Sequence, residues 1–181
     1  MDSNNLVLLS EVKVNEKFKT EIGEFIVLEH TEEGTKVITK DLFKEDVKFG
    51  HNCDYKTSTL RELCDGEIYE AFAAVFGADN IVEHEADLTT IDMQQDYGKV
   101  NCRVRPLTFD EVRKYNEVLA NPELPDWWWT ITPWSTPKRG WSYTVAVVAS
   151  SGDFNCNLCD NRSGVRPFCI LKSNIFVSKG E

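Results

Sequence analysis

The segment Asp126-Trp127-Trp128-Trp129-Thr130-Ile131-Thr132-Pro133-Trp134 decides the fold of this chain, because it carries three consecutive tryptophans. Each indole buries roughly 200 Å² of surface when it is covered, and its N–H needs a hydrogen-bond partner. In a strand, Trp127 and Trp129 face one side of the sheet and Trp128 faces the other. The segment therefore predicts a central strand that is covered on both faces.

Length, composition and charge narrow the class of protein. The chain has 181 residues, of which 41% are hydrophobic, so we expect a single domain, residues 1–181, with one sizeable core. Asp and Glu number 30 against 20 Lys and Arg, which gives a formal net charge of -10. Such a charge repels nucleic acid and anionic membranes and favours a protein partner with a basic surface. Charge that serves solubility alone is the alternative.

The sequence has no signal for export or membrane insertion. It contains no run of 18 apolar residues, and residues 1–5 lack the positive charge and apolar core of a signal peptide. We therefore expect a cytoplasmic protein whose cysteines are reduced thiols rather than a disulfide framework. The six cysteines are Cys53, Cys64, Cys102, Cys156, Cys159 and Cys169.

Two of these cysteines have the spacing of zinc ligands. Cys156-x-x-Cys159 supplies one pair, and His51-x-Cys53 would supply the other half of a tetrahedral site. One pair is only half a site, and in a strand residues three apart point to opposite faces. The sequence therefore predicts no metal here: one thiol packs inward as a small apolar residue, and the other points outward near Asp160.

The first third of the chain predicts strands. Short apolar and β-branched pieces within residues 6–40 are separated by turn residues, which is typical of an N-terminal meander of hairpins. Residues 41–57 are polar and are expected to be irregular.

The middle of the chain, residues 58–120, predicts helices. A first helix is expected over 58–76 with an interruption at Gly66, and its start is expected at Thr59, which forms a capping box with Glu62. A second helix is expected over Phe109–Leu119, because Thr108 and Glu111 have the capping-box spacing.

The last part, residues 126–177, predicts a Trp-rich antiparallel sheet. Its strands are expected over 127–131, 141–149 and 165–171, all in one sheet, with a return strand over Phe154–Leu158. Helices that precede such a sheet can cover one of its faces, so the fold class is α+β.

Four motifs in this order carry a resemblance. They are Ser58-Thr59-Leu60-Arg61-Glu62-Leu63-Cys64-Asp65, a helix from Glu111 to Tyr115, Trp128-Trp129-Thr130-Ile131-Thr132-Pro133, and Gly164-Val165-Arg166-Pro167. With them the chain resembles an uncharacterised domain of Firmicutes and their phages, which is similar in turn to C-type lectins, phage receptor-binding proteins and formylglycine-generating enzymes. The resemblance implies a single C-type-lectin-like domain with a central antiparallel sheet, two to three helices and a bacterial host.

The chain departs from that family at two places. Ile131 stands where the family's tryptophan strand carries an arginine, and Leu63-Cys64 stands where its first helix carries Trp-Leu. The resemblance also implies a minor alternative, a metal-dependent oxidase similar to formylglycine-generating enzyme, because Cys156 and Cys159 precede residues 164–166 as a copper-binding pair does in that family.

No other catalytic pattern is present in the sequence. The histidines are His30, His51 and His84, and none lies in a hydrolase or metalloprotease motif. Glu83-His84-Glu85 is typical of a solvated strand face. The sequence therefore predicts a binding protein without a cofactor, and not an enzyme.

The loop between Trp134 and Trp141 is the candidate contact surface. It is polar and rich in Pro and Gly, it carries Lys138 and Arg139, and we expect it to expose at least one indole. The remaining motif residues are expected to be structural, with Arg166 buried against a carboxylate or backbone carbonyls. These structural residues are Trp127, Trp128, Trp129, Gly164, Arg166 and Pro167.

Two functions from different classes remain open. The first is a non-catalytic protein-binding module, most concretely a stoichiometric inhibitor encoded by a phage or mobile element. Such an inhibitor, like an anti-CRISPR protein, would occupy the basic nucleic-acid groove of a host defence nuclease. The second is a lectin-like ligand-binding domain of phage or cell-surface biology.

Overall fold

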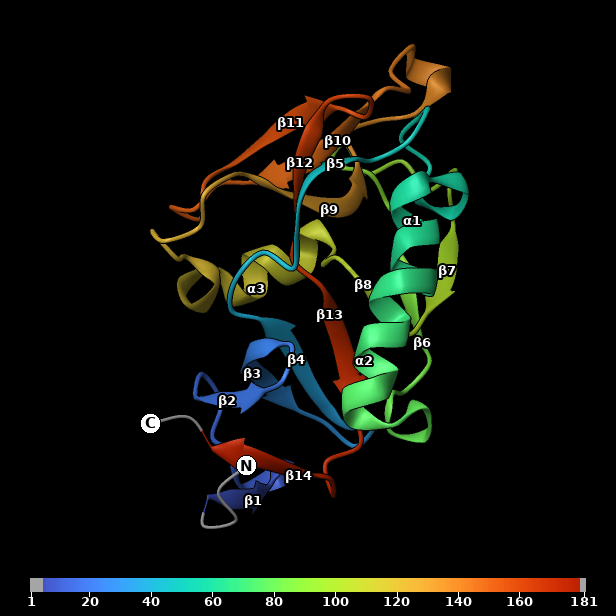
Figure 1. The fold of residues 1–181 in the computed structure, drawn as a ribbon. Coiled ribbons are helices and arrows are strands. Elements are labelled where there is room, and N and C mark those ends of the chain that lie inside the picture. The colour runs from blue at the N-terminus through green and yellow to red at the C-terminus, as the bar shows by residue number, and fades with distance from the viewer. Residues whose placement is uncertain (1–4, 180–181) are drawn as a thin grey trace.

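A computed structural model describes residues 5–179 and shows a mixed α+β protein built mostly of strands (Figure 1). Two sheets of different size lie one above the other in that view, and a long helix runs beside both. Neither helix of residues 5–179 combines the length and the apolar composition needed to cross a bilayer.

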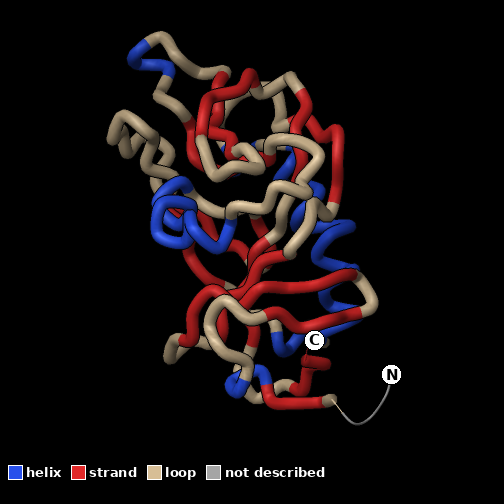
Figure 2. The backbone as a smooth tube through the Cα atoms, turned by 90° about the vertical axis from the view of Figure 1, so that its left-hand side faces the viewer, coloured by secondary structure: helices blue, strands red, loops and turns tan. Residues whose placement is uncertain are grey.

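The larger sheet contains seven strands that pair antiparallel throughout. It lies in the lower part of the molecule in Figure 2. Its order is β1 (Leu6–Leu8), β14 (Phe176–Lys179), β2 (Lys17–Thr20), β3 (Gly23–His30), β4 (Thr35–Thr39), β13 (Phe168–Leu171) and β8 (Val104–Arg105). The expected meander is confirmed for β2, β3 and β4, which pair in sequence. β1 departs from it, because it pairs with β14 from the other end of the chain.

The smaller sheet holds the tryptophan segment at its centre. Its order is β11 (Phe154–Leu158), β10 (Thr144–Val148), β9 (Trp128–Pro133), β12 (Arg162–Val165) and β5 (Lys44–Lys48). β9 pairs antiparallel with β10 on one side and parallel with β12 on the other, so the expectation of a purely antiparallel sheet is wrong at this pair. The side chains of Trp128 and Trp129 are both 0% exposed. The prediction of a central strand covered on both faces is confirmed.

Several expectations for these strands are wrong. Residues 165–171 do not form one strand, because the chain breaks at Arg166-Pro167 and passes from β12 in the smaller sheet to β13 in the larger one. Residues 141–143 precede β10 without joining it, and β5 lies within the segment expected to be irregular. Trp127 is 37% exposed rather than part of the core.

The first helix is continuous through Gly66, contrary to expectation. α1 (Thr59–Leu63) passes through a π-helical turn (Cys64–Ile68) into α2 (Tyr69–Phe76), so the apolar face is carried past the glycine without a break. Its N-cap is Ser58 rather than Thr59, because the Ser58 side chain accepts a hydrogen bond from the Arg61 backbone.

The second helix, α3 (Phe109–Leu119), has the expected bounds. Thr108 and Glu111 form the expected capping box, in which each side chain accepts from the other's backbone N–H. The described residues therefore contain two helices, counting α1 and α2 as one. A two-stranded ribbon of β6 (His84–Asp87) and β7 (Lys99–Cys102) lies next to the long helix (Figure 1).

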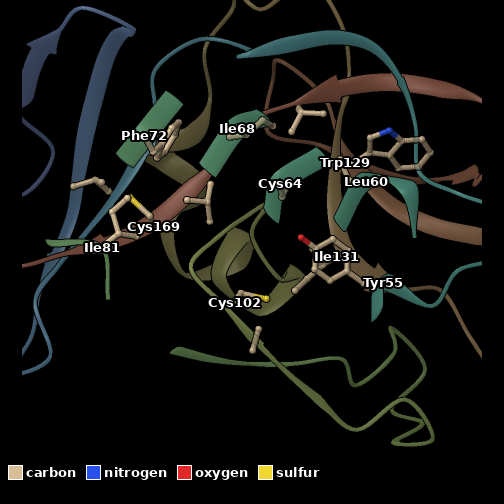
Figure 3. Packing of buried hydrophobic residues seen from close by; sticks show 14 of the residues in the cluster. Tyr55, Leu60, Cys64, Ile68, Phe72, Ile81, Cys102, Trp129, Ile131 and Cys169 are labelled. Atoms are coloured by element: carbon tan, nitrogen blue, oxygen red, sulfur yellow. The ribbon is translucent and has the colours of Figure 1, made fainter. Parts of the chain in front are cut away.

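The first helix packs against both sheets from one side. Figure 3 shows Leu60, Cys64, Ile68 and Phe72 along one of its faces, within the same cluster as Trp129 and Ile131 of β9. The Trp129 indole packs edge-on against Phe49, at 5.5 Å between ring centroids, and donates to the Val47 carbonyl oxygen at 2.8 Å. A second cluster around Trp128 packs beneath α3.

Arg166 joins the two sheets at the point where the chain crosses between them. It is fully buried, and its guanidinium donates to the carbonyl oxygens of Thr39 at 2.8 Å, Leu119 at 2.7 Å and Lys40 at 2.9 Å. Burial lowers the pKa of Arg166 to about 10, so the side chain stays charged at neutral pH. One side chain thus connects the meander, α3 and the Gly164–Pro167 motif.

Candidate functional site

The loop between β9 and β10 is folded onto its neighbours. It contains a short 3₁₀ turn (Pro137–Arg139), which ends at Gly140 with a φ of 72°, and it forms the orange tip at the top of Figure 1. Trp134 is partly buried, and its backbone N–H donates to the Thr144 carbonyl oxygen at 3.0 Å. The side chains that follow, Lys138 and Arg139, are exposed.

Asp92 fixes this loop to the segment between β6 and β7. One carboxylate oxygen accepts from the Ser135 hydroxyl at 2.6 Å and from the Arg139 guanidinium at 2.9 Å. The other accepts from the Thr90 hydroxyl at 2.5 Å. Burial opposes ionisation of Asp92, but these hydrogen bonds and the Arg139 charge outweigh it and lower the pKa of the carboxyl group. Asp92 is therefore ionised at neutral pH and holds three donors in place.

Trp141 stands on this fixed loop with 48% of its surface exposed. Its indole N–H donates to the Thr144 hydroxyl, and its backbone N–H donates to the Thr136 carbonyl oxygen at 3.1 Å. Tyr143, two residues on, is also exposed. Here the four exposed side chains Lys138, Arg139, Trp141 and Tyr143 are named the Trp141 surface. Three of them belong to the set expected from sequence, and Trp134 contributes only a partly buried ring.

A cavity of about 550 Å³ lies on another part of the molecule. It opens between the β6–β7 ribbon, strands β13 and β8 of the larger sheet and the start of α3, and glutamates dominate its charged lining. Its lining residues are Glu33, Lys36, Glu83, His84, Glu85, Asn101, Arg105, Glu111, Phe168 and Ile170. We expected residues 83–85 to form a solvated face, but this expectation is wrong for His84, whose side chain is partly buried.

Hydrogen bonds on both ring nitrogens fix the tautomer of His84. Nε2 lies 2.9 Å from Nε of Arg105, which can only donate, so Nε2 is the acceptor. Nδ1 lies 3.2 Å from the Val82 carbonyl oxygen and carries the proton. Burial lowers the pKa of His84 to about 4, and the adjacent Arg105 charge adds to the shift. His84 is therefore a neutral ring without a free lone pair for proton transfer.

Glu111 completes this arrangement. Its two carboxylate oxygens accept from the Arg105 guanidinium at 2.7 and 3.1 Å. Burial alone would raise the pKa of Glu111, but the Arg105 charge and hydrogen bonds lower it overall. Arg105 also lies over the Phe168 ring, 4.6 Å from its centroid. Each member of this group therefore already has protein partners.

A smaller hollow of about 250 Å³ lies beside Trp127. The partly exposed indole of Trp127 meets a set of amide, hydroxyl and charged side chains there. Besides Trp127 and Val147, the lining residues are Asp126, Asn155, Cys156, Asn157, Arg162 and Ser163. The Asn157 amide donates to the Ser163 hydroxyl at 3.1 Å, which links β11 to β12 across the curled sheet. Sequence reasoning missed this hollow, because it depends on how β11 and β12 approach one another.

The cysteines and the histidine considered as metal ligands lie in different surroundings. Cys159 is buried, Cys156 is partly exposed on β11, and His51 is exposed. Cys53 is buried, and its sulfur lies 3.1 Å from the Tyr97 hydroxyl. Burial raises the pKa of both the Cys53 and the Cys159 thiols, so they are protonated at neutral pH. Within residues 5–179 no three His, Cys, Asp or Glu side chains gather as a metal site.

Comparisons of the chain with protein-family models, with curated proteins and with solved structures found no match.

Proposed function

We propose that this chain is a non-catalytic protein-binding module, most concretely a stoichiometric inhibitor of a host defence nuclease, as anti-CRISPR proteins are. The observation that carries the proposal is the Trp141 surface. There an aromatic side chain is half exposed, yet its indole N–H is already satisfied by Thr144 and its loop is fixed by Asp92. Such a side chain presents a rigid apolar face to a partner.

The residue types of the Trp141 surface suit a binding hot spot. Trp, Tyr and Arg are the residues whose truncation most often removes binding energy from protein interfaces. A loop that is ordered before binding avoids the cost of immobilising each side chain, about 0.5–1.5 kcal/mol apiece. The ion pairs of Lys138 with Asp96 and of Arg139 with Asp92 contribute to this order. The loop therefore supports binding without rearrangement.

The charge of the chain supports a basic partner. A net charge of -10 attracts a positively charged groove and repels the nucleic acid that the groove would otherwise hold. Within the inhibitor proposal, the Trp141 surface anchors the complex and the acidic surface competes with nucleic acid. Association should then slow as salt is added, while the anchor contacts persist.

A nuclease assay tests this proposal. The protein is mixed with purified nucleic-acid-guided effector nucleases of bacterial hosts, and co-elution and DNA cleavage are measured over a range of salt concentrations. Inhibition that saturates at one inhibitor per nuclease is expected for the proposed partner. Full cleavage and separate elution for every effector at low salt would contradict it.

The fold supports a more specific structural proposal. A long helix before a Trp-rich sheet, with Gly164–Pro167 at the sheet junction, fits a single C-type-lectin-like domain. A structure of the purified protein that pairs the strands in another order would contradict this. The host cytoplasm follows from the proposed nuclease partner, which acts there.

The hollow beside Trp127 favours a second candidate, a lectin-like ligand-binding domain. A partly exposed indole beside Asp126, Asn155 and Arg162 offers one apolar face and several hydrogen-bonding groups, which suits the mixed surface of a sugar. A glycan array tests it, with Trp127→Ala as the variant that removes the indole. Binding that is lost in this variant but kept in Trp141→Ala would support it, and an array without hits would contradict it.

A further inference from the structure

The five-stranded sheet has two edges of opposite character. One edge is β5, Lys44-Glu45-Asp46-Val47-Lys48, whose charged side chains discourage pairing with another strand. The other edge is β11, Phe154-Asn155-Cys156-Asn157-Leu158, which has no charge and no proline. Phe154 is 51% exposed and Leu158 is 48% exposed. Only β11 is therefore open to a further strand.

The outward backbone groups of β11 are known from its pairing with β10. Cys159 N–H donates to the Tyr143 carbonyl oxygen at 2.8 Å, and Ala149 N–H donates to the Asp153 carbonyl oxygen at 2.8 Å. Hydrogen-bonded pairs alternate along an antiparallel ladder, so the backbone N–H and C=O groups of Asn155 and Asn157 point towards β10. The backbone groups of Phe154, Cys156 and Leu158 consequently point away from the sheet.

Two local contacts cover only part of this edge. The Cys156 N–H donates to the side-chain oxygen of the adjacent Asn155 at 2.8 Å, and the Leu158 carbonyl oxygen accepts from Asn161 N–H at 3.0 Å. Within the described residues, the Phe154 and Leu158 N–H groups have no hydrogen-bond acceptor. An incoming strand can pair with these two N–H groups directly, and with the Cys156 N–H once the Asn155 side chain turns away.

We propose that β11 pairs with β11 of a second copy of this chain, antiparallel and across a two-fold axis through Cys156. The strand is nearly palindromic about that residue, so the pairing sets Phe154 against Leu158 of the other copy, Asn155 against Asn157, and Cys156 against itself. Apolar side chains meet apolar ones on one face, and amides meet amides on the other.

The proposed pairing would limit assembly to two copies. The two five-stranded sheets merge through their β11 edges, and each end of the merged sheet is then a charged β5 strand. In this register the two Cys156 residues form a hydrogen-bonded pair, whose Cα atoms lie about 5.5 Å apart in such ladders. This separation is within the usual range for a disulfide. Cys156 is also the one cysteine of the described residues that is not buried.

Light scattering across a concentration series tests the proposal, with oxidative cross-linking as a second measurement. We expect twice the monomer mass for the wild type, and a monomer for Leu158→Lys, which sets a charge against Phe154 of the other copy. Phe176→Lys is the matched control, since Phe176 is an exposed aromatic on β14, which is paired on both sides, and this variant stays dimeric. A wild type that is monomeric throughout would overturn the proposal.

Cross-linking separates ordered pairing from random collision. Diamide takes two electrons and two protons from a pair of thiols as their disulfide forms. We expect a covalent dimer of the wild type and none of Cys156→Ser. Leu158→Lys keeps Cys156, so loss of the cross-link in this variant supports the register, and an unchanged cross-link contradicts it.

A charge swap keeps the test decisive if Leu158→Lys fails to fold. Asn155→Asp with Asn157→Asp sets like charges against each other across the two-fold axis and is expected to be monomeric. Asn155→Asp with Asn157→Lys sets opposite charges against each other and is expected to be dimeric. The same oligomeric state for both variants would rule out this register.

Discussion

The guanidinium of Arg166 lies over the ring of Trp128, with its central carbon 5.4 Å from the ring centroid, and both side chains are fully buried. The indole N–H of Trp128 has no hydrogen-bond partner within the described residues, so this indole contributes packing and a cation–π contact. The contact joins the Gly164–Pro167 motif to the tryptophan segment. Trp128 and Arg166, which are 38 positions apart in the sequence, thus meet at the junction of the sheets.

Replacing Arg166 is expected to destabilise the fold strongly. Arg166→Met keeps most of the volume but leaves the carbonyl oxygens of Thr39, Lys40 and Leu119 without their donor. We expect a loss of about 3 kcal/mol or more in the free energy of unfolding, measured by urea titration. The exposed Arg113→Met is the control, with a change below about 0.5 kcal/mol. Equal effects for the two variants would contradict the role given to Arg166.

Gly34 is expected to be far less replaceable than Gly23. Both glycines have a positive φ, 148° and 125° respectively, so alanine is strained at either position. A Cβ at Gly34 would also clash with the Leu171 carbonyl oxygen, whereas none of the surrounding atoms lies within 4 Å of a Cβ at Gly23. Gly34→Ala should therefore cost roughly 1–3 kcal/mol more than Gly23→Ala. Similar melting temperatures for the two variants would contradict the close approach of β13 to this turn.

Stability is expected to fall on acidification through the titration of His84. The pKa of His84 lies near 4 in the folded protein and near 6.5 in the unfolded chain, so the unfolded state binds more protons between these values. The contribution of neutral His84 to the free energy of unfolding is thus fully present above about pH 6.5 and is lost as the pH falls towards 4. Arg105 and Lys36 oppose protonation of the ring, while Glu111 favours it.

The control for this pH dependence is His84→Gln. Glutamine can still accept from Arg105 but does not titrate. The slope of unfolding free energy between pH 6.5 and 4.5 should therefore be smaller in the variant, as measured by urea titration at each pH. An unchanged slope would show that other groups cause the acid sensitivity. Glu29, whose pKa is lowered to about 2 chiefly by its hydrogen bond from Tyr115, titrates at lower pH.

Local signals were enough to predict much of the fold. The capping box of Thr108 and Glu111 predicted the start of α3, and three adjacent tryptophans predicted a strand covered on both faces. Each of these features depends on residues close together in the chain. The π-helical turn at Gly66 could not be predicted from local signals. Packing of the flanking apolar residues overrides the weak helix propensity of glycine there.

Long-range relationships could not be predicted in this way. β5 has a charged sequence and joins the sheet through pairing with β12, more than 100 residues later. The change of sheet at Arg166-Pro167 depends on which partners β12 and β13 find. His84 looked solvated because its partner Arg105 comes from another strand, and the attachment of the Trp141 loop to Asp92 joins residues more than 40 positions apart.

Asp92→Asn is expected to loosen the Trp141 surface without unfolding the protein. The amide keeps an oxygen for one donor but loses the charge that pairs with Arg139. We expect faster hydrogen exchange in residues 134–143 and a change in unfolding free energy below about 1 kcal/mol. Under the inhibitor proposal, the dissociation rate of the complex should also rise. Unchanged exchange in this loop would contradict the role of Asp92.

The most direct test of the proposed function compares two tryptophans by calorimetric titration against the inhibited nuclease. Trp141→Ala should keep the fold and weaken binding by about tenfold or more, which corresponds to roughly 1.4 kcal/mol. Trp127→Ala removes a similarly exposed indole from the other candidate site and should leave binding unchanged. Full affinity of Trp141→Ala, or a loss confined to Trp127→Ala, would contradict the account.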